Sequence, residues 1–213
     1  SLNLKKNSVV IMPAVNFIAA FNVCKILELN IFLSDVNPIT GLMEPKNFND
    51  CVRKYNLKKI NLIINMHMGG NPNNVQFFYK IKKKFKSYLI EDSCHALGSE
   101  YFSKKKYYKI GDCNHADIST FSFHAIKSIT TGEGGAITTN NKFFFNNIID
   151  IRSHGIKRHS NDHWKYDVLF PSFNFRISDI NCALGISQLK KIRLFLKKRN
   201  KIAKVYHSKL STL

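Results

Sequence analysis

The sequence predicts an α/β fold built on a mainly parallel β-sheet. Short apolar runs that end in turn residues indicate buried strands, and helical stretches of about ten or more residues separate several of them. Strands that alternate with helices form βαβ units, whose strands run parallel. With 213 residues, of which 44% are hydrophobic, the chain can bury a substantial core as one domain.

The expected elements follow one another along the whole chain. Asn16 is the expected N-cap of the first helix, in which apolar residues recur at helical spacing from Phe17 to Leu27. The run 143–145 is expected in the core face of a later helix. Strands are predicted at residues 9–13, 30–36, 60–66, 88–92, 118–123 and 135–139, and helices at 16–28, 75–86, 143–152 and 177–208, the last as one helix or two.

The charge of the chain is strongly positive. Thirty-three Lys and Arg against 14 Asp and Glu give +19, which is typical of nucleic-acid binding. The basic residues are spread along the chain, as in residues 82–84, 104–106 and 197–199, without a nucleic-acid-binding motif. We favour compositional drift, with a positive field that attracts small anions. A basic nucleic-acid-binding domain remains the alternative from another class.

The cysteines and the apolar runs indicate the cellular compartment of the protein. Five cysteines without a CxxC pair fit reduced thiols in a cytoplasm. Every apolar run is shorter than the ~18 residues that a membrane-spanning helix needs, and the first residues contain no signal-peptide core. The sequence therefore predicts a cytoplasmic protein without a membrane partner.

One lysine stands out from the others. Lys127 follows the predicted strand 118–123, between apolar neighbours and a cluster of glycines. A poorly solvated lysine has a lowered pKa and becomes an amine nucleophile that can form a Schiff base. The hydroxyls of Ser122, Thr130 and Thr131 could hold an anion beside it. A plain glycine turn explains the segment equally well.

A carboxylate ends another predicted strand. Asp92 closes the strand 88–92, where the simplest role is a helix N-cap. Pyridoxal phosphate needs a carboxylate at its ring nitrogen and benefits from a flat side chain on its ring face, which His95 could provide. Ligands of parallel sheets bind at the carboxyl ends of strands, where both segments are expected.

These segments, in this order and separation, resemble the DegT-type nucleotide-sugar aminotransferases, which are pyridoxal-phosphate enzymes of fold type I. The resemblance extends over essentially all 213 residues and includes segments 12–19, 152–155 and 173–185. Within the family, the stretches SCHALGSEY and FSFHAIKSITTGEGGAITTN are most similar to transaminases of the pseudaminic acid pathway. Transaminases that make perosamine share much of the pattern.

The resemblance implies a role for each site residue. Lys127 is implied to bind the cofactor as a Schiff base and to move the proton during catalysis. Asp92 is implied to face the pyridine nitrogen, His95 to lie against the ring and Ser122 to bind the phosphate. Asn174 is implied to reach the phosphate in the partner subunit's site, which implies a homodimer. The implied substrates are glutamate and a nucleotide-linked 4-keto-6-deoxy sugar.

The resemblance also bears on reaction type and completeness. Family members that remove a hydroxyl group carry histidine at the position of Lys127, so lysine favours transamination. Residues 1–213 correspond to the large domain, and an N-terminal phosphate-binding turn and most of the small domain are expected to be absent. An inactive remnant is therefore a further alternative.

Other chemistry is less well supported by the residues. His154, His159 and His163 do not follow a compact zinc-binding spacing, so no metal is expected, and His154 is expected near the cofactor or substrate. Ser119, Ser122 and His124 lack the G-x-S-x-G pattern of a hydrolase.

Overall fold

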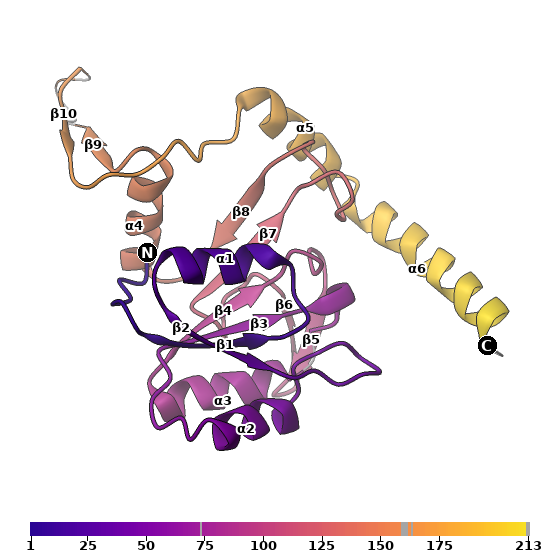
Figure 1. Cartoon of the computed structure of the whole chain (residues 1–213). Helices are drawn as coiled ribbons and strands as arrows, with labels where there is room; N and C mark the ends of the chain where they lie inside the picture. Colours follow the sequence, from indigo (N-terminus) through magenta and orange to yellow (C-terminus); the bar gives the residue numbers. More distant parts are fainter. Residues whose placement is uncertain (73, 159–161, 163, 212–213) are drawn as a thin grey trace.

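A computed structural model describes all residues except 73, 159–161, 163 and 212–213. Its centre is a six-stranded sheet in the order β2-β1-β3-β4-β7-β8 (Figure 1). The first five strands in this order are parallel, and β8 is antiparallel to β7. The predicted mainly parallel α/β fold is therefore confirmed. The strands are β1 (Val9–Pro13), β2 (Asn30–Ser34), β3 (Leu62–Met66), β4 (Tyr88–Asp92), β7 (Ile118–Ser122) and β8 (Gly135–Thr138).

Helices cover both faces of this sheet (Figure 1). Val10 packs with residues of α1 (Ile18–Ile26) and α4 (Lys142–Arg152). Its neighbour Ile11 points to the other face, toward α2 (Pro45–Lys54) and α3 (Val75–Phe85). Successive strand residues point to opposite faces, and both faces are buried here. This is why the central strands are continuous apolar runs rather than alternating patterns.

The C-terminal part of the chain forms two helices, α5 (Asp179–Leu189) and α6 (Ile192–Leu210). We call residues 177–210 the arm. Its α6 extends away from the sheet (Figure 1). Of the two predicted possibilities, one helix or two, the structure has two.

Several smaller elements were not predicted. They are α2, the short helix η1 (Met68–Gly70), and the hairpin strands β5 (Glu100–Ser103), β6 (Lys106–Lys109), β9 (Ile156–Arg158) and β10 (Tyr166–Val168).

Two local predictions were wrong. Asn16 is not the N-cap of α1, because the cap position is Phe17 and the Asn16 Oδ1 accepts the adjacent Phe17 N–H at 2.7 Å. The run 143–145 is not uniformly core. Phe144 is 4% exposed, whereas Phe143 and Phe145 are 56% and 54% exposed, because successive helical residues point about 100° apart.

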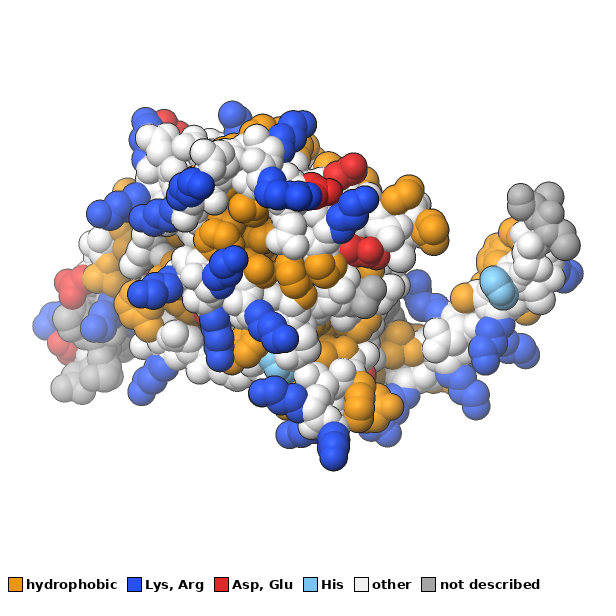
Figure 2. All heavy atoms as spheres, turned by 90° about the horizontal axis from the view of Figure 1, so that it is seen from below, with side chains coloured by type: hydrophobic (Ala, Val, Ile, Leu, Met, Phe, Trp, Pro, Cys, Tyr) orange, Lys and Arg blue, Asp and Glu red, His pale blue; other side chains and the backbone are white. Residues whose placement is uncertain are grey.

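The surface agrees with the basic composition. Lys and Arg side chains are scattered among apolar and neutral ones over the face in Figure 2, rather than gathered in one patch. Among the helices that the structure describes, every one is too short or too polar to cross a membrane.

Candidate active site

Three neighbouring strands bring the candidate residues to one edge of the sheet. Met66 pairs with Asp92, and Asp92 pairs with Thr120, so the carboxyl ends of β3, β4 and β7 lie side by side. Asp92 is the last residue of β4, and Ser122 is the last residue of β7. The fold therefore puts both segments at the carboxyl edge of the sheet, as the sequence predicted.

The main chain fixes the Asp92 carboxylate. The Cys94 N–H donates to Asp92 Oδ1 at 3.1 Å, and the His67 N–H donates to the Asp92 main-chain oxygen at 3.0 Å. Asp92 thus has the capping geometry of the simpler prediction, although the residues after it form turns rather than a helix. The side chain is half-buried, and beyond the bonds with Cys94 its carboxylate has acceptor capacity left for a ligand.

His95 lies within the electrostatic reach of both Asp92 and Lys127. Its Nδ1 accepts the Gly69 N–H at 3.4 Å, which leaves the hydrogen of the neutral ring on Nε2. Burial lowers the pKa of His95 below 6.5, the charge of Lys127 lowers it further, and Asp92 opposes both. The imidazole is therefore held neutral beside a carboxylate and an amine.

Lys127 lies on the loop between β7 and β8, residues 123–134, which we call the lysine loop. Lys127 is half-buried, with Ile129 buried and Ile126 exposed, so the apolar setting is present on one side only. Its N–H donates to the His124 carbonyl at 3.0 Å, and its own carbonyl accepts from the Arg199 guanidinium at 2.9 Å. The loop and α6 together therefore fix the main chain from which the amine extends.

The hydroxyls near this loop differ in what they bond. Thr130 donates to the Phe123 carbonyl at 3.2 Å, and Thr131 donates to the Glu133 carbonyl at 2.7 Å. Both hydroxyl hydrogens are used within the loop. Ser122 Oγ accepts the His124 N–H at 3.3 Å, which leaves its hydrogen for another acceptor. Of the three predicted anion ligands, Ser122 fits best.

Cys94 lies beside the same charges but is not a nucleophile. Burial, followed by a hydrogen bond and the charge of Asp92, raises the pKa of its thiol to about 12. The thiol therefore stays protonated at neutral pH.

Asn174 lies on a different segment from the other candidates. It pairs with Ser153, which follows α4, and its Oδ1 accepts the Arg176 N–H at 3.1 Å. His154 is beside it, with its N–H bonded to the Phe173 carbonyl. His159 and His163 of the histidine-rich stretch lie outside the described residues. Among the residues that are described, no three metal-binding side chains gather.

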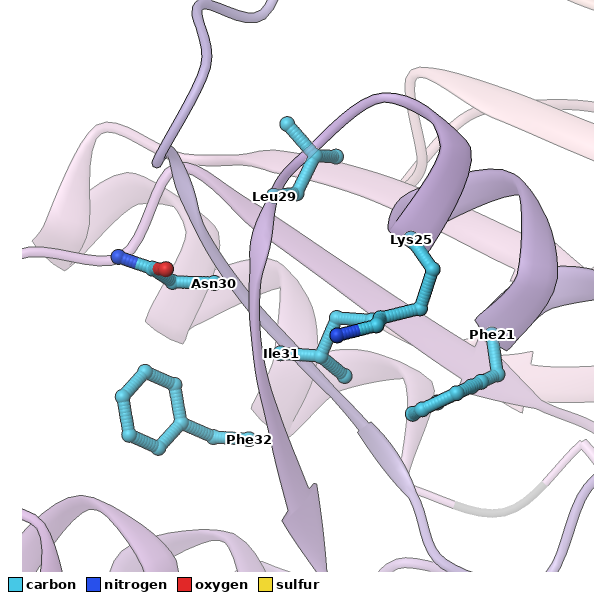
Figure 3. A pocket seen from close by; sticks show the side chains of 6 residues that line it. All are labelled: Phe21, Lys25, Leu29, Asn30, Ile31 and Phe32. Carbon is cyan, nitrogen blue, oxygen red and sulfur yellow. The ribbon is translucent and has the colours of Figure 1, made fainter.

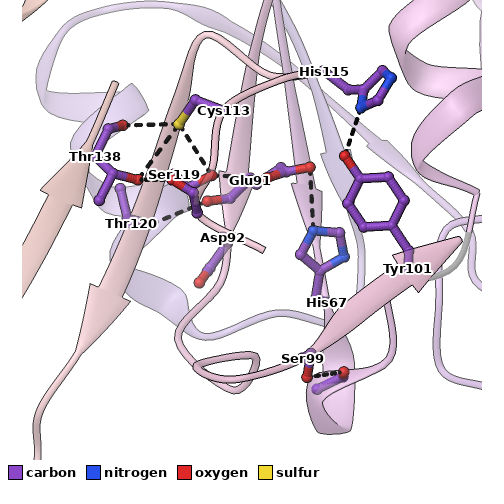
Figure 4. A network of polar contacts seen from close by, with 12 residues as sticks. His67, Glu91, Asp92, Ser99, Tyr101, Cys113, His115, Ser119, Thr120 and Thr138 are labelled. Atoms are coloured by element: carbon purple, nitrogen blue, oxygen red, sulfur yellow. Dashed lines mark hydrogen bonds and ion pairs between the residues drawn. The ribbon is translucent and has the colours of Figure 1, made fainter. Parts of the chain in front are cut away.

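A buried polar network that the sequence analysis missed lies behind the site (Figure 4). Glu91, 4% exposed, accepts from Ser119 Oγ at 2.7 Å and lies 3.5 Å from Nε2 of the fully buried His67. Cys113 continues the network, because its Sγ lies 3.7 Å from Ser119 Oγ and 3.4 Å from Thr138 Oγ1. The network thus joins β4, β7 and β8 to His67, which directly follows β3. The clue in the sequence was Glu91, a carboxylate inside an otherwise apolar strand.

A shallow pocket lies elsewhere on the molecule (Figure 3). It is lined by Phe21, Lys25, Leu29, Asn30, Ile31 and Phe32. These residues lie on α1, at the beginning of the edge strand β2 and, for Leu29, directly before β2. Asp92 and Ser122, in contrast, end their strands. The pocket is therefore separate from the candidate site.

Comparison with known proteins defines the class to which this fold and site belong. The chain matches the DegT/DnrJ/EryC1/StrS aminotransferase family over residues 1–213, and it belongs to that family.

Two curated relatives and one solved structure illustrate the similarity. The UDP-4-amino-4,6-dideoxy-N-acetyl-beta-L-altrosamine transaminase of Campylobacter jejuni serotype O:23/36 is 37% identical over 94% of this chain and 51% of its own length. The GDP-perosamine synthase of Escherichia coli O157:H7 is 30% identical over 100% of this chain and 55% of its own length.

The solved structure is that of Helicobacter pylori PseC, an aminotransferase involved in the biosynthesis of pseudoaminic acid. It superposes with a TM-score of 0.84 at 30% identity, over 98% of this chain and 53% of PseC. The chain thus spans about half the length of the curated relatives it matches.

The donor set fits the cofactor of this class. Pyridoxal phosphate is the cofactor that the family and its fold indicate. An amine, a carboxylate with an available oxygen and a flat neutral ring meet its chemical needs, and all three lie at the carboxyl edge of the sheet.

Proposed function

We propose that the chain is the cofactor-binding large domain of a transaminase that moves an amino group from glutamate to a nucleotide-linked 4-keto-6-deoxy sugar. The observation that supports this most is the convergence of Asp92, His95 and Lys127 in a chain of an aminotransferase family. The name of the 37% identical Campylobacter relative supports a UDP-linked sugar. The similarity to PseC, an aminotransferase involved in the biosynthesis of pseudoaminic acid, supports a sugar of that pathway.

The chemistry is divided between the cofactor and the chain. When bound, pyridoxal phosphate supplies a carbon that an amine can attack and a ring that withdraws electrons. Lys127 would hold the cofactor through its amine and would move a proton as general base and acid. The Asp92 carboxylate accepts a charge-assisted hydrogen bond from the protonated ring nitrogen and stabilises its charge. His95 would lie against the ring, and Ser122 would hold the phosphate.

The remaining part of the site comes from outside this large domain. We infer a homodimer in which Asn174 contributes to the partner's site, because the resemblance to the family implies this role for Asn174. The other contacts are supplied by segments that the longer relatives contain. The isolated chain should accordingly bind the cofactor more weakly than a longer one.

The assignment of Lys127 is tested by reduction with borohydride in the presence of pyridoxal phosphate, followed by peptide mapping. Label is expected on the peptide that contains Lys127 and not on Lys83 or Lys84, which are exposed and serve as an internal surface control. Label spread evenly over surface lysines, with Lys127 unmodified, would refute the assignment.

A second candidate substrate rests on the perosamine synthase, which is 30% identical over the whole chain. Amino transfer from glutamate to UDP-linked and GDP-linked keto sugars, compared in the same protein, decides between the two. Faster turnover of the GDP-linked sugar would favour the perosamine type.

A further inference from the structure

We propose that Arg199 is a positioning residue for Lys127, and that the arm holds the lysine loop in place. The functional meaning of this inference rests on the proposed function, whereas the contact itself does not. The arm is far from Lys127 in the sequence, yet it contacts the loop at several points.

The most direct contact is between α6 and the lysine itself. The Arg199 guanidinium donates to the Lys127 carbonyl at 2.9 Å, and the Lys127 N–H is bonded to His124 inside the loop. Both polar groups of the Lys127 main chain are therefore held, one from within the loop and one by the arm. A hydrogen bond from a charged donor is stronger than a neutral one, and a fixed main chain limits the directions in which the amine can point.

Helix α5 holds the far side of the same loop. Asn181 Nδ2 donates to the main-chain carbonyl of Thr131. A Cβ added to Gly185 would lie 2.9 Å from the Thr131 methyl group, and one added to Gly134 would lie 2.7 Å from Ile177. The glycines of the loop and of α5 thus permit the close approach between them.

The arm also reaches the segment that carries Asp92 and His95. A Cβ on Gly98 would lie 2.5 Å from Leu196 Cδ1 and 3.7 Å from Ile192 Cγ1 of α6. One helix therefore contacts both segments of the candidate site.

The test compares two arginines of one helix. Arg199→Met removes the donor but keeps an apolar stem, and Arg199→Lys keeps a cationic donor. Arg193→Met is the matched control, because Arg193 is an exposed arginine on α6 six positions away. Hydrogen–deuterium exchange of the lysine loop and the fraction of Lys127 trapped by pyridoxal phosphate and borohydride are measured in each variant.

In Arg199→Met, the loop amides are expected to exchange about two- to tenfold faster, the scale of one exposed hydrogen bond from a charged donor. The fraction of trapped Lys127 should fall as well. Arg199→Lys should recover part of both effects, and Arg193→Met should match the unmodified chain.

Equal exchange and trapping in Arg199→Met and Arg193→Met would overturn the proposal. A failure of the proposed function gives a different result from a failure of this proposal. If the proposed function is wrong, Lys127 is not trapped in any variant, whereas the exchange of the loop still shows whether Arg199 holds it.

Discussion

Glu91 and Ser119 tie β4 to β7 with a buried hydrogen bond of 2.7 Å, one residue before Asp92 and three before Ser122. The bond lies on the face of β4 opposite to the Asp92 side chain, since successive strand residues alternate. The network around Glu91 therefore fixes the strands whose ends carry the site.

Replacing this buried carboxylate should destabilise the fold. Glu91→Ala leaves the Ser119 hydroxyl in the core without its acceptor and removes the carboxylate that lies 3.5 Å from the His67 ring. A cost of about 1–3 kcal/mol is expected, the usual penalty for an unsatisfied buried polar group. The urea midpoint measures it. Glu100→Ala, at an exposed position of β5, is the control and should leave the midpoint unchanged. Equal midpoints in the two variants would show that the network contributes nothing.

The Asp92 carboxylate should matter for catalysis more than for folding. Asp92→Asn keeps an acceptor for the Cys94 N–H but loses the negative charge for the ring nitrogen. Transamination should fall on the order of hundredfold or more, the scale of losing one preorganised electrostatic group. The conversion of glutamate to 2-oxoglutarate by the whole protein measures this, with the exposed Asp50→Asn as control. Near-normal turnover would show that Asp92 acts only as a capping residue and not in catalysis.

Gly135 should be intolerant of a side chain because two strands meet there. It pairs with Ser122, and an added Cβ would lie 2.5 Å from the Phe121 main-chain oxygen, which cannot move without separating β7 from β8. Gly135→Ala should cost about 1–3 kcal/mol. Gly69→Ala is the comparison, since its Cβ would meet nothing within 4 Å and only its φ of +62° opposes the change. If Gly69→Ala proved the more destabilising in thermal unfolding, the close approach at Gly135 would not limit stability.

The sheet could be predicted because its strands are buried on both faces. Both ends of the strand 88–92 were predicted correctly, because the sequence shows an apolar run that ends at Asp92, next to a turn. Helix α2 was not predicted, because its polar face dominates and only Phe48 and Cys51 are buried. The pairs Glu91–Ser119 and Arg199–Lys127 join residues that are 28 and 72 positions apart, so no local sequence pattern predicts them. Only the folded sheet and arm bring them together.

The stability of the chain should depend on pH through His115. His115 is 7% exposed, and its ring nitrogens lie 2.5 Å from the Tyr101 hydroxyl and 2.9 Å from the Gln76 amide nitrogen. Burial lowers its pKa below 6.5, Glu91 opposes this, and the charges of Lys104 and Lys83 add to the lowering. The neutral ring is therefore the form that the fold favours.

The sign of the effect follows from proton binding. Between the pKa of the folded state and 6.5, the unfolded chain binds more protons at this histidine than the folded one. The contribution of His115 is complete above pH 6.5 and is lost as the pH falls toward the folded pKa. His95, whose pKa is also lowered, contributes in the same direction.

Urea midpoints measured on both sides of this window should therefore fall on acidification. The fall should be smaller in His115→Gln, which cannot take up a proton. His95→Gln, measured in parallel, separates the contribution of the second histidine. An unchanged fall in His115→Gln would mean that the buried His115 does not couple protonation to folding.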